Sequence, residues 1–246
     1  MVVFLTSSPC DDNVPEGVSL PCILFEKNGF VERMRQWWKP DSVGVIIAAS
    51  PCAFPLNDEM RDTFEKAFAY HGLTFDRLLM CDARNEDNLQ EMIDDADFIM
   101  LAGGHVPTQN AYFKHLGLRE KMAYFQGIVM GISAGSMNCA DMVYVQPELE
   151  GESLDPYFER FVSGLGVCKV NILPHYQMVK DNLLDGRRLI EDITFEDSMG
   201  QEFIVLVDGS YVMVYDGMTE VYGQAWKISD GKMTEICRDH EKRLLF

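Results

Sequence analysis

The chain has 246 residues, 47% of them hydrophobic, which is enough to bury one large core or two small ones. Its 39 acidic and 21 basic residues give a formal net charge of −18 at pH 7. A surface of this charge repels phosphate backbones and anionic membranes, so we expect neither nucleic acid nor a membrane surface as a partner.

The first residues and the cysteines favour a cytoplasmic protein. Met1–Leu5 is an apolar run with no basic region before it, too short for the hydrophobic part of a signal peptide, and Val2–Leu5 is expected to form a first strand. The seven cysteines include no CxxC pair, which favours reduced, buried thiols over disulfides or a zinc site. We therefore expect no metal and no cofactor.

Apolar, β-branched runs then alternate with segments of helical period. After the first strand, further strands are expected at Val43–Ala49, Phe75–Met80, Phe98–Ala102 and Gly127–Gly131. The expected helices are Phe25–Trp38, Asp58–His71, Glu86–Ile93, Thr108–Phe125 and a helix of small residues from Ala134. Runs that are apolar on both faces predict a parallel sheet covered by helices on each side, the doubly wound α/β class.

Beyond about Met142 the pattern changes to a Pro- and Glu-rich loop, a strand near Cys168–Leu173 and a helix near Asp185–Asp197. Short strands are expected at Phe203–Val207, Tyr211–Tyr215 and Ala225–Ile228, with Asp-Gly turn signals after them. These segments predict antiparallel C-terminal strands that extend the same sheet. Because no repeat or linker interrupts the chain, residues 1–246 are expected to form a single domain.

The segment Gly131-Ile132-Ser133-Ala134-Gly135 places a GxSxG motif between a buried strand and a helix. In this nucleophile elbow the serine adopts a strained turn, and the glycines allow the strand and helix to pack closely. The Ser133 hydroxyl would then lie at the carboxyl end of the sheet, near free helix N–H groups. Ser133 is the predicted nucleophile, although a serine that only caps the helix would show the same string.

A serine nucleophile needs a base. His71 and His115 lie at helix ends and His240 lies in a charged tail, so capping or solvated roles are expected for these three. His175 follows an apolar strand that ends in Pro174, at a strand end where open α/β sheets gather their ligands. His175 is therefore the predicted base.

The base in turn needs a carboxylate to orient it. Asp208 ends the apolar strand from Phe203 and is the first candidate, although Asp208-Gly209 also fits a simple hairpin turn. The alternative carboxylates are Glu196, Asp197 and Glu202.

The oxyanion of the reaction needs two backbone N–H donors. Ala134 would supply one of them. The second is expected from Gly103-Gly104, which follow a strand and allow close backbone approach.

Three motifs in this order resemble the dipeptidase E and cyanophycinase family of serine peptidases. Leu101–Gln109 is similar to the family's glycine-rich GGNT loop, Gly131–Asn138 to its elbow, and Leu173–Tyr176 to its PHF segment. The similarity spans Val43–Gly217. It implies the flavodoxin-like fold of class I glutamine amidotransferases, with serine in place of their cysteine.

Carried over position by position, the resemblance implies Ser133 as nucleophile, His175 as base and Asp208 as the acidic residue, where dipeptidase E has glutamate. Gly104 and Ala134 would form the oxyanion hole. These are the residues to which the motif and strand-end arguments also lead.

One departure from the family concerns the GG loop, where His105 replaces asparagine and adds a titratable group to the cleft. Dipeptidase E requires an amino-terminal aspartate, and Lys180, Arg187 and Arg188 are the candidates to bind it here. Asp185 would disfavour that ligand. Solvated arginines at an ordinary helix start explain this segment equally well.

We therefore predict hydrolysis of amide bonds in small peptides, with N-terminal Asp-X dipeptides as one substrate class. An α/β-hydrolase-type esterase with His240 as base and a non-catalytic peptide-binding protein are the alternatives. Trp37-Trp38 are expected to pack on the sheet or on a partner subunit, which leaves a homodimer open.

Overall fold

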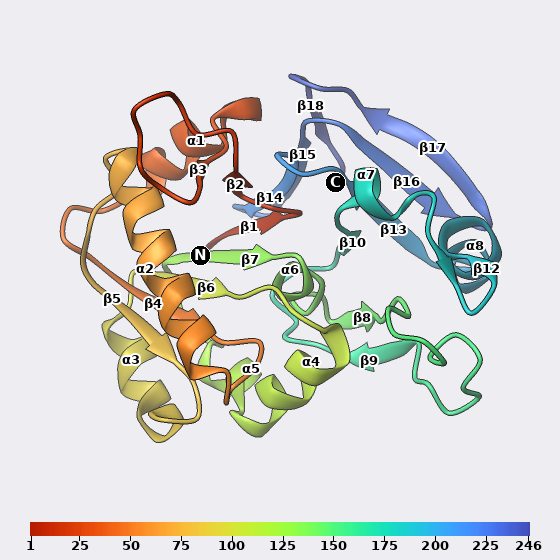
Figure 1. Ribbon diagram of the computed structural model, residues 1–246, viewed down its shortest axis with the longest axis horizontal. Helices are drawn as coiled ribbons and strands as arrows, with labels where there is room; N and C mark the ends of the chain where they lie inside the picture. The colour runs from red at the N-terminus through yellow and green to blue at the C-terminus, as the bar shows by residue number, and fades with distance from the viewer.

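The computed structural model describes residues 1–246 and has an α/β architecture built around a sheet of eight strands (Figure 1). The strand order is β18-β15-β14-β1-β7-β6-β4-β5. In chain order these strands are β1 (Val2–Thr6), β4 (Ser42–Ile47), β5 (Phe75–Cys81), β6 (Phe98–Leu101), β7 (Ile128–Ile132), β14 (Tyr211–Tyr215), β15 (Met218–Tyr222) and β18 (Lys242–Leu244).

Strands β1, β7, β6, β4 and β5 pair in parallel, whereas β14, β15 and β18 join the β1 edge in antiparallel pairs. The sequence prediction of a mostly parallel sheet with antiparallel C-terminal strands is confirmed. The parallel strands are apolar on both faces because helices cover both faces.

The helices are α1 (Phe30–Trp37), α2 (Phe54–Tyr70), α3 (Leu89–Asp95), α4 (Val106–His115), α5 (Leu118–Lys121), α6 (Ala134–Met137), α7 (Tyr176–Val179) and α8 (Phe195–Asp197). Short 3-10 turns precede α1 and α3 at Lys27–Gly29 and Glu86–Asn88. Helices α1 and α3 therefore start later than expected, α2 and α4 start earlier, and the helix expected to run to Phe125 breaks at Gly117. All of them lie where the periodicity placed them. No helix combines the length and hydrophobicity of a membrane span.

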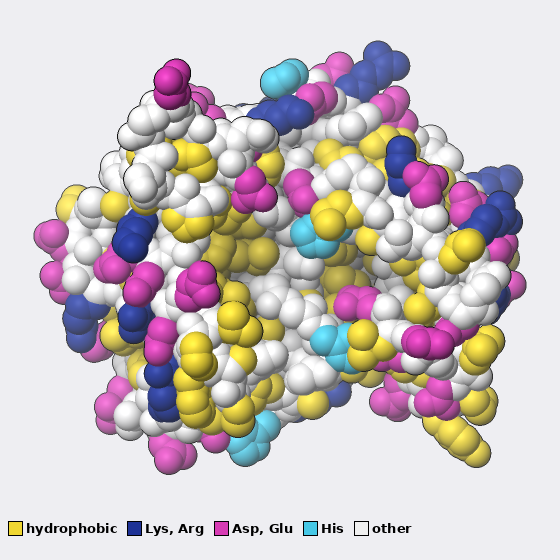
Figure 2. Space-filling view, in the orientation of Figure 1, with side chains coloured by type: hydrophobic (Ala, Val, Ile, Leu, Met, Phe, Trp, Pro, Cys, Tyr) yellow, Lys and Arg dark blue, Asp and Glu magenta, His cyan; other side chains and the backbone are white.

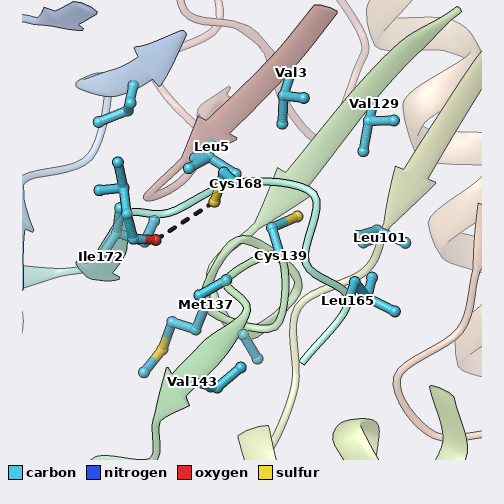
Figure 3. Packing of buried hydrophobic residues seen from close by; sticks show 14 of the residues in the cluster. Val3, Leu5, Leu101, Val129, Met137, Cys139, Val143, Leu165, Cys168 and Ile172 are labelled. Atoms are coloured by element: carbon cyan, nitrogen blue, oxygen red, sulfur yellow. Dashed lines mark hydrogen bonds between the residues drawn. The ribbon is translucent and has the colours of Figure 1, made fainter. Parts of the chain in front are cut away.

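The core is divided by the sheet, as the alternation of side chains along β1 shows. Val3 and Leu5 belong to one buried cluster, with side chains of α3, α4 and α5, while Phe4 belongs to the other, with α1 and α2. Figure 3 shows part of the first cluster, where Met137 and Cys139 pack below the sheet. Five of the seven cysteines are buried and all are unpaired.

A second sheet of four strands, in the order β10-β13-β16-β17, lies beside the central sheet (Figure 1). Its strands are β10 (Asn171–Leu173), β13 (Glu202–Leu206), β16 (Ala225–Ser229) and β17 (Lys232–Cys237). Our expectation that all C-terminal strands extend one sheet is wrong for β13 and β16. Alternating hydrophobicity identifies a strand but not its partner, and the chain crosses between the sheets at Asp208-Gly209.

The remaining elements are short. Three two-stranded pairs are formed by β2 (Cys10–Asp11) with β3 (Ile23–Leu24), β8 (Met142–Tyr144) with β9 (Phe161–Ser163), and β11 (Leu183–Leu184) with β12 (Arg187–Arg188). The helix expected over Asp185–Asp197 is shorter than predicted, because Arg187-Arg188 pair as a strand before a π-helical turn at Leu189–Thr194.

Trp37-Trp38 end α1 as expected. The Trp38 ring packs against Phe68, Phe75 and Phe98, with ring centroids 5.4, 4.8 and 5.5 Å away. Trp37 is 39% exposed.

Candidate active site

Ser133 occupies the sharp turn between β7 and α6. Its backbone has φ 51° and ψ −114°, a left-handed conformation that is strained for a residue with a side chain. The Ser133 N–H donates to the carbonyls of Thr6 and Ser7, at 3.1 Å each, and these bonds hold the strained turn against the end of β1. A strained turn between a strand and a helix is the backbone arrangement that the GxSxG motif accompanies in serine hydrolases.

The two motif glycines lie where no side chain fits. A Cβ atom at Gly131 would lie 2.5 Å from the Ser136 Cα atom, and one at Gly135 would lie 2.2 Å from the Leu101 carbonyl oxygen. Both contacts are to backbone atoms, which cannot rotate away. The close packing of α6 on β6 and β7 therefore requires glycine at both positions.

His175 and Asp208 meet because their strands are parallel neighbours. Leu173 of β10 pairs with Val205 of β13, so the residues that follow these strands leave the second sheet at the same edge. The His175 Nδ1 and Asp208 Oδ1 atoms are 2.7 Å apart. An Nδ1–H that donates to the carboxylate leaves Nε2 as the proton acceptor of the ring.

The Asp208 carboxylate accepts two further hydrogen bonds. Ser7 Oγ donates to Oδ1 over 2.6 Å, and Gln177 Nε2 donates to Oδ2 over 2.6 Å. Burial alone would raise the pKa of Asp208, but the bonds from His175, Ser7 and Gln177 outweigh it and hold this pKa below its ordinary value. Asp208 is therefore ionised at neutral pH.

The alternative carboxylates lie elsewhere. Glu196 pairs with Arg187, Asp197 accepts a bond from Tyr144, and Glu202 pairs with Lys227.

Ser7 was missed by the sequence analysis. It is fully buried directly after β1, and its Oγ accepts the His175 backbone N–H over 2.7 Å while donating to Asp208. Its carbonyl accepts the Ser133 N–H. Ser7 thus contacts all three predicted catalytic residues. It can do so because β1 pairs with β7, and the sequence pattern does not predict which strands pair.

The predicted oxyanion donors lie on two sides of Ser133. Ala134 follows it as the first residue of α6, and Gly104 belongs to the wall of the cavity that contains Ser133. A Cβ at Gly103 would lie 3.5 Å from the Ser133 Cβ, and one at Gly104 would lie 2.6 Å from the Ala49 Cβ. The glycine pair thus brings its backbone close to the serine.

Ser133 and His175 open into one cavity of about 260 Å³. The wall is formed by Gly104, Ser133, Met137, Gln146, Pro147, Glu148, Pro174, His175, Val179, Asn182, Leu183, Leu184 and Leu189. Figure 2 shows histidine side chains beside a hollow on this face, with an acidic side chain between them. The wall combines apolar and polar residues and contains no lysine or arginine.

The basic residues considered for substrate binding lie outside this wall. Arg187 pairs with Glu196 over 2.6 Å, and Arg188 pairs with Asp192 over 2.6 Å. Lys180 is exposed and has no ion-pair partner. The structure therefore does not bring these three cations together with Ser133.

His105 follows Gly104 in the chain but is not itself part of the cavity wall. Its Nδ1 bonds to Thr108 Oγ1 over 2.8 Å and its Nε2 to Glu152 Oε1 over 3.0 Å. The second Glu152 oxygen accepts the N–H groups of Glu148 and Leu149 at 2.8 and 2.9 Å. His105 thus connects the glycine loop to the loop that carries Glu148.

No three His, Cys, Asp or Glu side chains converge in a way that would hold a metal ion.

Comparison with known proteins finds a matching family and similar solved structures. The model of peptidase family S51 matches residues 49–222, a segment that contains all the site residues from Gly104 to Asp208. The 1.5 Å crystal structure of a candidate peptidase E from Listeria monocytogenes EGD-e superposes with a TM-score of 0.53 at 14% identity, covering 96% of this chain and 97% of that one. No protein with a curated function matches the sequence.

Proposed function

Because this chain belongs to peptidase family S51, we propose that it hydrolyses amide bonds of small peptides through an acyl-enzyme on Ser133. One observation carries the proposal: a strained serine and a histidine bonded to a half-buried carboxylate face the same cavity. These are the parts that serine acyl transfer requires.

In the first half-reaction the Ser133 Oγ attacks the peptide carbonyl carbon while His175 Nε2 takes the hydroxyl proton. The N–H groups of Gly104 and Ala134 stabilise the negative carbonyl oxygen, and Asp208 stabilises the imidazolium. When the C–N bond breaks, the imidazolium gives its proton to the leaving amine.

In the second half-reaction, water attacks the Ser133 ester with His175 again as the base. The C–O bond to the serine breaks, Ser133 regains its proton and the free carboxylic acid leaves.

The size of the cavity favours a short substrate. Its volume of about 260 Å³ lies just below the usual range of ligand pockets, roughly 300–1,000 Å³. It therefore suits one or two residues around the scissile bond.

A preference for N-terminal aspartate, as in dipeptidase E, has weaker support. It would need a cation near the cavity, and Lys180, Arg187 and Arg188 lie outside its wall.

No specific observation supports the two alternatives, the esterase and the non-catalytic peptide-binding protein. His240 is 74% exposed with Asp239 3.7 Å away, and it lies outside the cavity, which does not favour an esterase that uses it. With His105 in place of asparagine, the chain still has the His175–Asp208 hydrogen bond and still has Ser133 and His175 in one cavity wall, which does not favour a protein that only binds peptides.

The test compares the wild type with Ser133→Ala on a dipeptide panel that contains Asp-X, Lys-X and neutral members, with released amino acids followed by mass spectrometry. We expect the substitution to lower kcat by about 10³-fold or more. Ser163→Ala, at an exposed serine of β9, is the matched control. Hydrolysis that survives Ser133→Ala would disprove the proposal.

A further inference from the structure

Glu148 is the one acidic residue in the wall of the Ser133 cavity, and no lysine or arginine accompanies it. Its carboxylate has no hydrogen bond or ion pair within the chain, unlike that of Glu152 nearby, which binds His105 and two backbone N–H groups. An acidic side chain in a substrate cavity without a partner leaves its bonding capacity for the ligand.

We propose that Glu148 binds a positively charged ammonium or guanidinium group of the substrate, so that the cavity selects cationic short peptides. The inference rests on the proposed peptide hydrolysis at Ser133 and adds the substrate class to it.

The loop that carries Glu148 is anchored on both sides. The Glu148 N–H donates to Glu152 over 2.8 Å, and Asp185 accepts the Gly151 N–H over 2.7 Å and the Ser153 hydroxyl over 2.6 Å. These charge-assisted bonds hold the backbone of Glu148 in place beside the cavity, which contributes to the preorganisation that selective binding needs.

The electrostatic surroundings also favour a cation. Glu148 is an exposed residue, yet the protein atoms around its carboxyl group raise its pKa, and the charge of Glu152 adds to the effect. His105 and His175 act in the opposite direction. A bound ammonium group would compensate the negative charge of the Glu148 carboxylate, which no lysine or arginine of the cavity wall does.

The rest of the wall matches the stem of a basic side chain. Met137, Val179, Leu184 and Leu189 provide an apolar surface for methylene groups, while Gln146 and Asn182 are its neutral polar members. The side chain of a substrate aspartate would be repelled by Glu148, because the wall contains no lysine or arginine to offset the two negative charges.

Two groups of a peptide carry this chemistry, the side chain of lysine or arginine and the free α-ammonium group. Norleucine has the lysine stem without its charge, and N-acetylation removes the α-ammonium charge. Comparing Lys-Ala, norleucyl-Ala, Asp-Ala and N-acetyl-Lys-Ala therefore separates the two sources.

The experiment measures kcat/KM on these four peptides for the wild type, Glu148→Gln and Glu150→Gln. Glu150 is an exposed residue of the same loop outside the cavity wall, which makes it the matched control. If Glu148 reads the side chain, wild type prefers Lys-Ala over norleucyl-Ala about tenfold, and Glu148→Gln alone removes the preference. If it reads the α-ammonium, N-acetylation costs about tenfold in the wild type and little in Glu148→Gln.

A binding measurement keeps this test independent of turnover. Titration calorimetry on Ser133→Ala, with and without Glu148→Gln, should show the same preference in Kd. If the wild type hydrolyses nothing while this binding preference appears, the proposed function fails and the inference stands. The inference is overturned if Glu148→Gln changes neither ratio, if Asp-Ala is preferred, or if no cationic peptide binds.

Discussion

Ser7 shows how one small side chain can position a whole catalytic group. Its hydroxyl oxygen accepts the backbone N–H of His175 over 2.7 Å and donates to Asp208 Oδ1 over 2.6 Å. One side chain therefore holds both the base and its carboxylate in position. It touches no reacting atom in the proposed mechanism, so it is a positioning residue.

We predict that Ser7→Ala lowers kcat by roughly 10- to 100-fold and changes KM little, because it removes two bonds that orient the base but no substrate contact. Asp208 also loses a donor, so its pKa should rise, and the acid limb of the pH–kcat profile should move to higher pH. Steady-state kinetics across pH check both effects, with Ser8→Ala as the neighbouring control. An unchanged kcat and an unmoved acid limb would show that Ser7 is only a packing residue.

At the scale of elements, the site depends on α6 lying directly against β6 and β7. Gly135 allows this contact, since a Cβ there would approach the Leu101 carbonyl oxygen to 2.2 Å. The nearest atoms are all backbone atoms of Leu101 and Ala102, which leave no room for adjustment, so the helix would have to move away from the sheet.

We predict that Gly135→Ala lowers the free energy of unfolding by about 2–3 kcal/mol, the usual scale of overpacking in a tight core. Urea denaturation measures the change. Gly103→Ala is the control, because a Cβ there meets its nearest atoms at 3.5 Å, an ordinary contact. Equal stability of the two variants would contradict the packing argument.

Local patterns predicted the elements that carry the site, because an apolar strand followed by a glycine turn is a local signal. That was sufficient for the turn at Ser133 and for the strand ends before His175 and Asp208. Which strands pair is determined by the whole chain. Local sequence therefore could not predict the second sheet, the contacts of Ser7 or the position of Glu148 in the cavity wall. The pairing of Arg187 and Arg188 with acidic neighbours was hidden for the same reason.

The stability of the whole molecule depends on pH through one buried histidine, although the chain as a whole is strongly acidic. His71 is 7% exposed, and burial lowers its pKa from the usual value of 6.5, with Arg35 adding to the effect and Glu26 opposing it. The unfolded chain therefore binds this proton more readily than the folded one.

We predict that the free energy of unfolding falls as the pH drops from about 6.5 toward the lowered pKa, with a slope of at most about 1.4 kcal/mol per pH unit from this group. Above pH 6.5 the contribution is fully present. Urea denaturation at pH 7.5, 6.5 and 5.5 should show a flatter dependence for His71→Gln than for the wild type. His115→Gln, at a 66% exposed side chain, should keep the wild-type slope, and equal slopes in all three proteins would refute the assignment.

The proposed chemistry depends on Ser133 as an activated nucleophile, which a covalent label can test. The protein would be incubated with a fluorophosphonate probe, its intact mass measured and the labelled residue located by peptide mapping. We predict a single adduct on Ser133 that is absent in Ser133→Ala and forms much more slowly in His175→Ala, because the histidine activates the hydroxyl. No adduct, or a label on another residue, would show that Ser133 is not the activated nucleophile.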